Sequence, residues 1–139
     1  MYKYIEPEVA GGLGNETIID KNYHPPIVKK LHYEFNGWLG DDILESFPCF
    51  IVSERLKNEI IKKNLKGIVF EYVKITKSEE FIYLYPKTEL PNFYWAIING
   101  KFGTDDFIIA NDYRLAINEK ALQVLNLFNL KNAILEDYK

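Results

Sequence analysis

The chain has 139 residues, 47% of them hydrophobic and 15% aromatic, and its 17 basic and 20 acidic residues leave a net charge of −3. This length and apolar share predict a single folded domain over residues 1–139 and exclude a disordered chain. The acidic balance argues against nucleic acids and anionic membranes as partners, because binding to either requires a concentrated positive field, and it favours a basic partner.

The cysteine count and the start of the chain bear on cellular location. A single cysteine excludes an internal disulfide framework and a cysteine-based zinc cluster. No apolar run approaches the length of about 20 residues that a membrane helix needs. Glu6-Pro7 stands where a signal peptide would have its apolar region. We therefore expect a cytoplasmic protein.

Turn-forming residues are frequent at the start of the chain, as in Gly11-Gly12-Leu13-Gly14-Asn15 and His24-Pro25-Pro26. They predict an irregular N-terminal arm over about residues 1–26, with one short strand at Thr17–Ile19. The next segment, Val28–Phe35, is rich in strand-forming residues and predicts a strand.

A capping pattern follows the first strand. Asp42 with Glu45 three residues later has the spacing of a capping box, which predicts a short helical turn up to Phe47. Pro48 cannot continue a helix, so the turn should end there. The apolar run Cys49–Val52 predicts a short buried strand.

The clearest helix of the first half begins after Ser53, which has the character of an N-cap. Apolar residues then recur at helical spacing, at Leu56, Ile60, Ile61 and Leu65. Gly67 suits the C-terminal end of this helix, and the alternating segment Ile68–Ile75 predicts a strand.

The second half is dominated by predicted strands. One further helix is expected from an Asn118 cap to about Asn129. The expected strands are Phe81–Tyr85, Asn92–Ile98, Asp106–Ala110, Arg114–Ile117 and Ala133–Tyr138. Together the elements predict an α+β fold with a mixed or antiparallel sheet and two main helices.

The two helical segments look like copies of each other. Ser53-Glu54-Arg55 aligns with Asn118-Glu119-Lys120 after a shift of 65 positions, without a gap. Each segment also follows a turn with glycine and paired aspartates. We interpret this as a duplicated strand–helix–strand unit, over about residues 36–75 and 100–138. The alternative is that two short β-α-β segments share only their capping and amphipathic patterns.

Two of these phrases resemble a known family. Phe50-Ile-Val-Ser-Glu-Arg-Leu-Lys57, followed by Leu65-Lys-Gly-Ile-Val-Phe70, resembles the immunity proteins of bacterial polymorphic toxin systems, particularly the α+β family called immunity protein eleven. A related phrase recurs at Ile117-Asn-Glu-Lys-Ala-Leu122 with Leu130-Lys-Asn-Ala133. The resemblance covers about half of the chain. It implies a cytoplasmic protein that binds and neutralises a cognate toxin domain, and it implies no catalytic residues.

The paired aspartates are the main candidates for chemistry. Asp41, Asp42, Asp105 and Asp106 would meet if the two units packed symmetrically, and four carboxylates could then hold a divalent cation or supply an acid and a base. The simpler interpretation is that aspartates beside glycine cap turns and accept backbone N–H groups. A third is that they form an acidic face for a basic toxin.

Other catalytic patterns are not found in the sequence. His24 and His32 lack metal-ligand spacing, and Cys49 lies between apolar neighbours that predict a buried thiol. The loop Gly11-Gly12-Leu13-Gly14 lacks the Lys-Ser/Thr of a phosphate-binding loop. We therefore expect no enzymatic activity, no cofactor and no bound metal.

Aromatic residues complete the set of candidate contacts. Trp38 lies in a glycine-flanked loop beside the first aspartate pair, and alternating aromatics place Tyr83, Tyr85 and Trp95 on predicted strands. Tyrosine and tryptophan are the residues that protein interfaces favour. We expect an immunity-type protein that binds a toxin domain through these aromatics and aspartates. A metal-dependent or carboxylate-based enzyme is the alternative, and the sequence leaves a homo-oligomer open.

Overall fold

The protein has an α+β fold, seen in a computed structural model that describes residues 1–139. Three helices are present: α1 (Glu54–Lys62), α2 (Glu79–Leu84) and α3 (Glu119–Leu125). The strands are β1 (Tyr2–Glu6), β2 (Gly11–Leu13), β3 (Ile18–Asp20), β4 (Ile27–Lys30), β5 (His32–Phe35), β6 (Ile43–Ser46), β7 (Cys49–Ser53), β8 (Ile68–Glu71), β9 (Lys74–Lys77), β10 (Phe93–Ile98), β11 (Phe107–Ile109), β12 (Leu115–Asn118) and β13 (Ile134–Asp137). None of the helices has the length and apolar character needed to span a bilayer.

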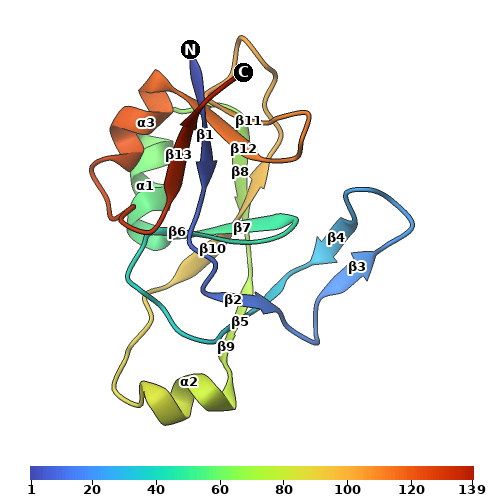
Figure 1. The fold of residues 1–139 in the computed structure, drawn as a ribbon, viewed down its shortest axis with the longest axis vertical. Coiled ribbons are helices and arrows are strands. Elements are labelled where there is room, and N and C mark those ends of the chain that lie inside the picture. The colour runs from blue at the N-terminus through green and yellow to red at the C-terminus, as the bar shows by residue number, and fades with distance from the viewer.

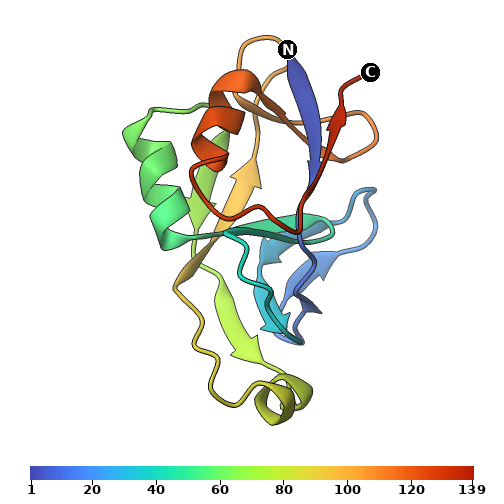
Figure 2. The same ribbon diagram turned by 60° about the vertical axis from the view of Figure 1, so that its left-hand side comes forward.

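The strands form two larger sheets and two smaller ones. The larger sheets have the orders β6-β7-β10-β8 and β11-β12-β1-β13. A three-stranded sheet, β2-β5-β9, and the ribbon β3-β4 make up the rest. Helices α1 and α3 lie beside each other in the part of the molecule that holds both termini, whereas α2 lies at the opposite end (Figure 1, Figure 2).

The two larger sheets are built alike, as the duplication predicts. Each contains a hairpin, then a helix, then an edge strand: β6-β7, α1 and β8 in one, and β11-β12, α3 and β13 in the other. The hairpin registers also correspond, because Ile43 pairs with Val52 and Phe107 pairs with Ile117. The sequence repeat therefore reflects a structural repeat of the strand–helix–strand unit.

The remaining strand of each sheet comes from the other repeat. β1 precedes the first unit in the chain but lies between β12 and β13, and β10 precedes the second unit but lies between β7 and β8. Tyr4 pairs with Glu136, and Trp95 pairs with Glu71, which stands 65 positions before Glu136. The two repeats thus exchange their leading strands within one chain.

The prediction of an irregular N-terminal arm over residues 1–26 is wrong. This segment holds β1, β2 and β3, and β1 is an inner strand of its sheet. The glycine signal misled because Gly11 is a strand residue: a Cβ there would lie 1.9 Å from the Glu34 carbonyl oxygen of the neighbouring strand β5. Glycine permits close strand approach here rather than a turn.

Two other segments have the opposite structure to the one expected. The helical turn expected from Asp42 is strand β6, because the Asp42 carboxylate binds groups from distant segments instead of capping a helix. The strand expected at Phe81–Tyr85 is helix α2 and its C-cap. Ser78 begins that helix, since its Oγ accepts the Phe81 N–H at 3.1 Å.

Several expected elements are correct, and others are shorter than expected. The Ser53 and Asn118 caps and strands β7, β10, β11, β12 and β13 fall where the sequence places them. Both capped helices end before the residues expected, at Lys62 and Leu125. Two predicted strands are each divided into two at a buried residue, Leu31 or Val73.

Two hydrophobic clusters hold the sheets and helices together. The larger packs α1 and α3 against both four-stranded sheets and includes Ile5, Leu56, Ile117 and Leu125. The second is rich in aromatic residues and joins β5, β7, β10 and α2 through Tyr33, Phe35, Ile51, Phe81 and Phe93. The second cluster fixes the end of the molecule that carries α2.

Candidate functional site

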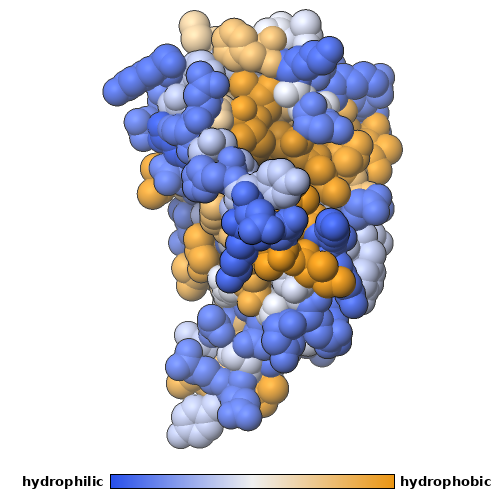
Figure 3. Space-filling view, turned by 90° about the vertical axis from the view of Figure 1, so that its right-hand side faces the viewer, coloured by the Kyte–Doolittle hydropathy of each residue, from blue (hydrophilic) through white to orange (hydrophobic).

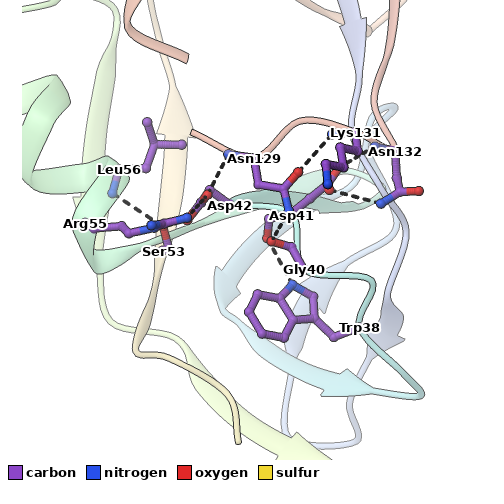
Figure 4. Close-up of polar contacts among 10 residues, drawn as sticks. All are labelled: Trp38, Gly40, Asp41, Asp42, Ser53, Arg55, Leu56, Asn129, Lys131 and Asn132. Carbon is purple, nitrogen blue, oxygen red and sulfur yellow. Dashed lines mark hydrogen bonds and ion pairs between the residues drawn. The ribbon is translucent and has the colours of Figure 1, made fainter. Parts of the chain in front are cut away.

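The Asp42 side chain is a buried hydrogen-bond centre between the two repeats (Figure 4). Its Oδ1 accepts the Ser53 Oγ–H at 2.6 Å, and its Oδ2 accepts the Asn129 N–H at 2.9 Å. Arg55 donates to both oxygens, at 2.8 and 2.7 Å. Burial raises the pKa of Asp42, but the hydrogen bonds from Arg55 and Ser53 outweigh it and hold the pKa below its usual value.

Asp106 makes the equivalent contacts in the second repeat. Its Oδ1 accepts from Asn118 Nδ2 at 2.8 Å, and its Oδ2 accepts the Lys66 N–H at 2.7 Å. Each aspartate therefore binds the N-cap residue of its own helix and the loop that follows the helix of the other repeat. We call Asp42 and Asp106, which make these equivalent contacts, the interlocking aspartates.

The other two aspartates have structural partners as well. Asp41 is fully buried and accepts from the backbone and the side chain of Asn132, at 2.8 and 3.0 Å. Asp105 is partly exposed and accepts the Lys101 N–H at 2.7 Å. No group of three or more His, Cys, Asp or Glu side chains is placed to hold a metal ion.

The position of the aspartates corrects one expectation. Asp41, Asp42 and Asp106 were candidate partner contacts on an acidic face, but they are buried, so a partner cannot reach them. Glycine-flanked aspartates often accept backbone N–H groups, and all four do so here. Only Asp105 keeps a partly exposed side chain.

The structure brings Trp38 and Tyr85 together in one pocket of about 370 Å³. Trp38 Nε1 donates to the Asp41 carbonyl oxygen at 2.9 Å, and its ring stands edge-on to Phe93. Tyr85 caps the C-terminus of α2, and its ring packs edge-on against Phe81. Both predicted aromatics are thus held in place by the second hydrophobic cluster.

The same pocket is lined by Glu8, which sequence reasoning missed. Glu8 is 6% exposed, and its Oε2 accepts the Leu39 N–H at 2.8 Å. Its Oε1 is buried and has no hydrogen-bond partner. Burial raises the pKa of Glu8, and the nearby charge of Asp41 adds to the rise. The signal available in the sequence was an acid beside the apolar pair Val9-Ala10, within the segment expected to be an irregular arm.

Helix α2 presents an apolar surface beside this pocket. Tyr83 is 84% exposed, and Ile82 and Leu84 are more than half exposed. A groove of about 1050 Å³ runs between β9, α2 and the segment before β10, and it is lined by Tyr72, Ile75, Ile82, Leu90, Pro91 and Tyr94 among others. Tyr83 and Tyr85, which were predicted as contacts on a strand, therefore belong to an exposed helix.

Trp95 lies elsewhere, on the face that carries the β3-β4 ribbon. That face has a hydrophobic area in its upper half (Figure 3). Trp95 is partly buried and lines a pocket of about 160 Å³ together with Pro25, Ile97 and Ile109. It is not part of the pocket that contains Trp38 and Tyr85.

No protein-family model matches this chain, and no curated protein matches it in sequence. The fold and its contacts define an α+β protein of two interlocked repeats. Its exposed candidate surface is made by α2, the adjacent groove and the pocket of Glu8, Trp38 and Tyr85.

Proposed function

We propose that this protein is of the immunity type and neutralises a toxin domain by binding to it and covering its active surface. The observation that carries the proposal is the surface of α2, where the consecutive residues Ile82, Tyr83 and Leu84 are exposed and continue into Tyr85. Soluble monomers seldom leave contiguous apolar side chains in water unless they bind something.

The composition of this surface suits a protein partner. Tyrosine is enriched at the centres of interfaces, where its ring buries a large area and its hydroxyl keeps a polar partner. The groove beside α2 offers a concave complement that a projecting segment of the partner can enter. A net charge of −3 favours a basic toxin domain, because opposite charges speed association.

No observation favours the carboxylate-based enzyme as a second candidate. Asp41, Asp42 and Asp106 each accept hydrogen bonds from donors of the chain itself. A carboxylate with these contacts is engaged in holding the fold and is buried away from any substrate. These three aspartates therefore give no support to an acid–base pair, and the partly exposed Asp105 has no second accessible aspartate of the four to act with.

The test is co-expression in a bacterial host with the toxin domain encoded beside the gene of this protein. We expect growth to be restored and a stable complex to elute from gel filtration. Tyr83→Ala should weaken the complex by about 30-fold, the loss expected for a tyrosine that is a hot spot of the interface. The matched control is Tyr23→Ala, which removes an exposed tyrosine between β3 and β4. No rescue together with no complex would refute the proposal.

A further inference from the structure

We propose that the pocket of Glu8, Trp38 and Tyr85 receives the cationic end of a lysine or arginine side chain of the protein partner. This inference rests on the proposed function for the source of the side chain, but the chemistry of the pocket stands on its own. Three segments build it: the linker between β1 and β2, the loop between β5 and β6, and the C-cap of α2. Its volume of about 370 Å³ equals that of about a dozen water molecules, enough for one long side chain.

The buried carboxyl group makes the pocket selective for a cation. Glu8 lines the pocket, its Oε1 has no hydrogen-bond partner, and its Oε2 accepts the Leu39 N–H. The Asp41 N–H also lies close enough to the carboxyl group to favour its charged form. No lysine, arginine or histidine lines the pocket, so the chain does not supply a counter-ion there. A buried acceptor without a partner costs free energy, which an ammonium or guanidinium donor would recover.

The aromatic residues complete a cation site. Trp38 uses its N–H on the Asp41 carbonyl, so it offers the pocket its ring and no donor. The Tyr85 ring lies against Gly37, where a Cβ would be 3.5 Å from Tyr85 Cε2. A carboxylate with two aromatic rings attracts a cation by charge and by cation–π interaction. An anion would meet the Glu8 charge and no donor side chain of positive charge.

The location of the pocket indicates that the cation belongs to a protein. Tyr85 borders the pocket and also directly follows the exposed apolar residues of α2. A partner that covers Tyr83 and Leu84 therefore passes the entrance of the pocket and can insert one basic side chain. This arrangement gives the interface an apolar area for affinity and a buried charge pair for specificity.

The test uses butylammonium and butylguanidinium ions as probes of the isolated protein, with 1-butanol as the neutral control. The readout is the indole N–H signal of Trp38 in NMR spectra of a Trp95→Phe variant, in which Trp38 is the only tryptophan. We expect both cations to shift this signal saturably and 1-butanol to leave it unchanged. Glu8→Gln should weaken cation binding at least about tenfold, because a neutral amide keeps the shape and loses the charge.

A second variant guards against a misfolded Glu8→Gln protein. Tyr85→Leu changes a half-exposed side chain and should weaken binding about threefold while the fold is kept. Absence of a saturable shift, equal binding of 1-butanol, or unchanged affinity in both variants would overturn the inference.

The toxin complex separates this inference from the proposed function. A complex that forms and is weakened by Tyr83→Ala, but not by Glu8→Gln, removes the cation site and leaves the function standing. Cation binding by the isolated protein without any toxin complex removes the proposed function and keeps the site.

Discussion

The replacement of Asp106 by asparagine tests whether the interlocking aspartates hold the two repeats together. Asp106 is 6% exposed and both of its oxygens are acceptors: Oδ1 for Asn118 Nδ2 and Oδ2 for the Lys66 N–H. Asparagine has nearly the same shape but one oxygen and one NH₂ group. Either orientation of the new amide therefore places a donor against a donor.

The two donors cannot relieve this conflict without a further loss of stability. The Lys66 donor is a backbone N–H, which cannot accept. The Asn118 side chain could turn, but its Oδ1 accepts the Ala121 N–H at 3.0 Å as the N-cap of α3. Turning the Asn118 side chain would remove the N-cap of α3, which contributes about 1 kcal/mol to stability. We therefore expect Asp106→Asn to lower the free energy of unfolding by about 1–3 kcal/mol.

The assay is urea and thermal unfolding followed by circular dichroism. For a chain of this length about 1 kcal/mol corresponds to a shift of about 4 °C in Tm, so the expected loss is about 4–12 °C. The control is Asp137→Asn, because the Asp137 side chain is 88% exposed and its ion pair with Lys3 lies on the surface. That change should cost less than about 0.5 kcal/mol. Equal stability of the two variants would refute the interlocking role.

Two further predictions concern single residues outside this contact. Burial, and to a smaller extent the charge of Glu6, raises the pKa of Glu45 to about 7. Between pH 4.5 and pH 7 the folded state therefore holds a proton that the unfolded state has released. The free energy of unfolding falls as pH rises through this range. Glu45→Gln should leave the free energy of unfolding unchanged at pH 4 and raise it at pH 8 by about 1–2 kcal/mol, after allowance for solvent screening. Urea unfolding at both pH values measures this effect. An equal change in the free energy of unfolding at pH 4 and pH 8 would contradict the raised pKa of Glu45. Gly11→Ala should lower the free energy of unfolding by more than about 2 kcal/mol, because its Cβ would lie 1.9 Å from the Glu34 carbonyl oxygen. The control is Gly12→Ala, which has open space around its Cβ and should cost under about 1 kcal/mol in the same urea unfolding experiment.

Local signals in the sequence predicted the elements that local contacts determine. Ser53 and Asn118 cap their helices through hydrogen bonds to residues three positions later, and the caps and the repeat between them were visible in the sequence. β1 was missed because its partners, β12 and β13, lie more than 100 residues away. Its turn-rich surroundings hid a strand that only these distant partners stabilise.

Helix α2 was missed for a different reason. Its aromatic residues Phe81, Tyr83 and Tyr85 alternate, which favoured a strand with one buried face. In the structure only Phe81 is buried, and the Ser78 cap decides in favour of the helix. The strand prediction also concealed how exposed Tyr83 is: this residue is 84% exposed on helix α2, and its role as a contact residue stays a prediction.

In the candidate site, single residues were identified from the sequence, but their arrangement was not. Trp38 and Tyr85 were predicted separately as contact residues, from their type and from the loop around Trp38. Their meeting in one pocket with Glu8 depends on tertiary structure alone, because the three residues lie in segments far apart in the sequence. No spacing pattern connects them.

The repeats and the candidate surface occupy different parts of the chain. Between β1 and β6 the first repeat carries an insertion with β2–β5, and between β8 and β10 a second insertion carries β9 and α2. The two insertions join through the parallel pairing of β5 with β9. Glu8 and Trp38 come from the first insertion and Tyr85 from the second. The pocket therefore lies outside the interlocked repeats, where the two insertions meet, and the side chain that we propose to enter it would contact both insertions.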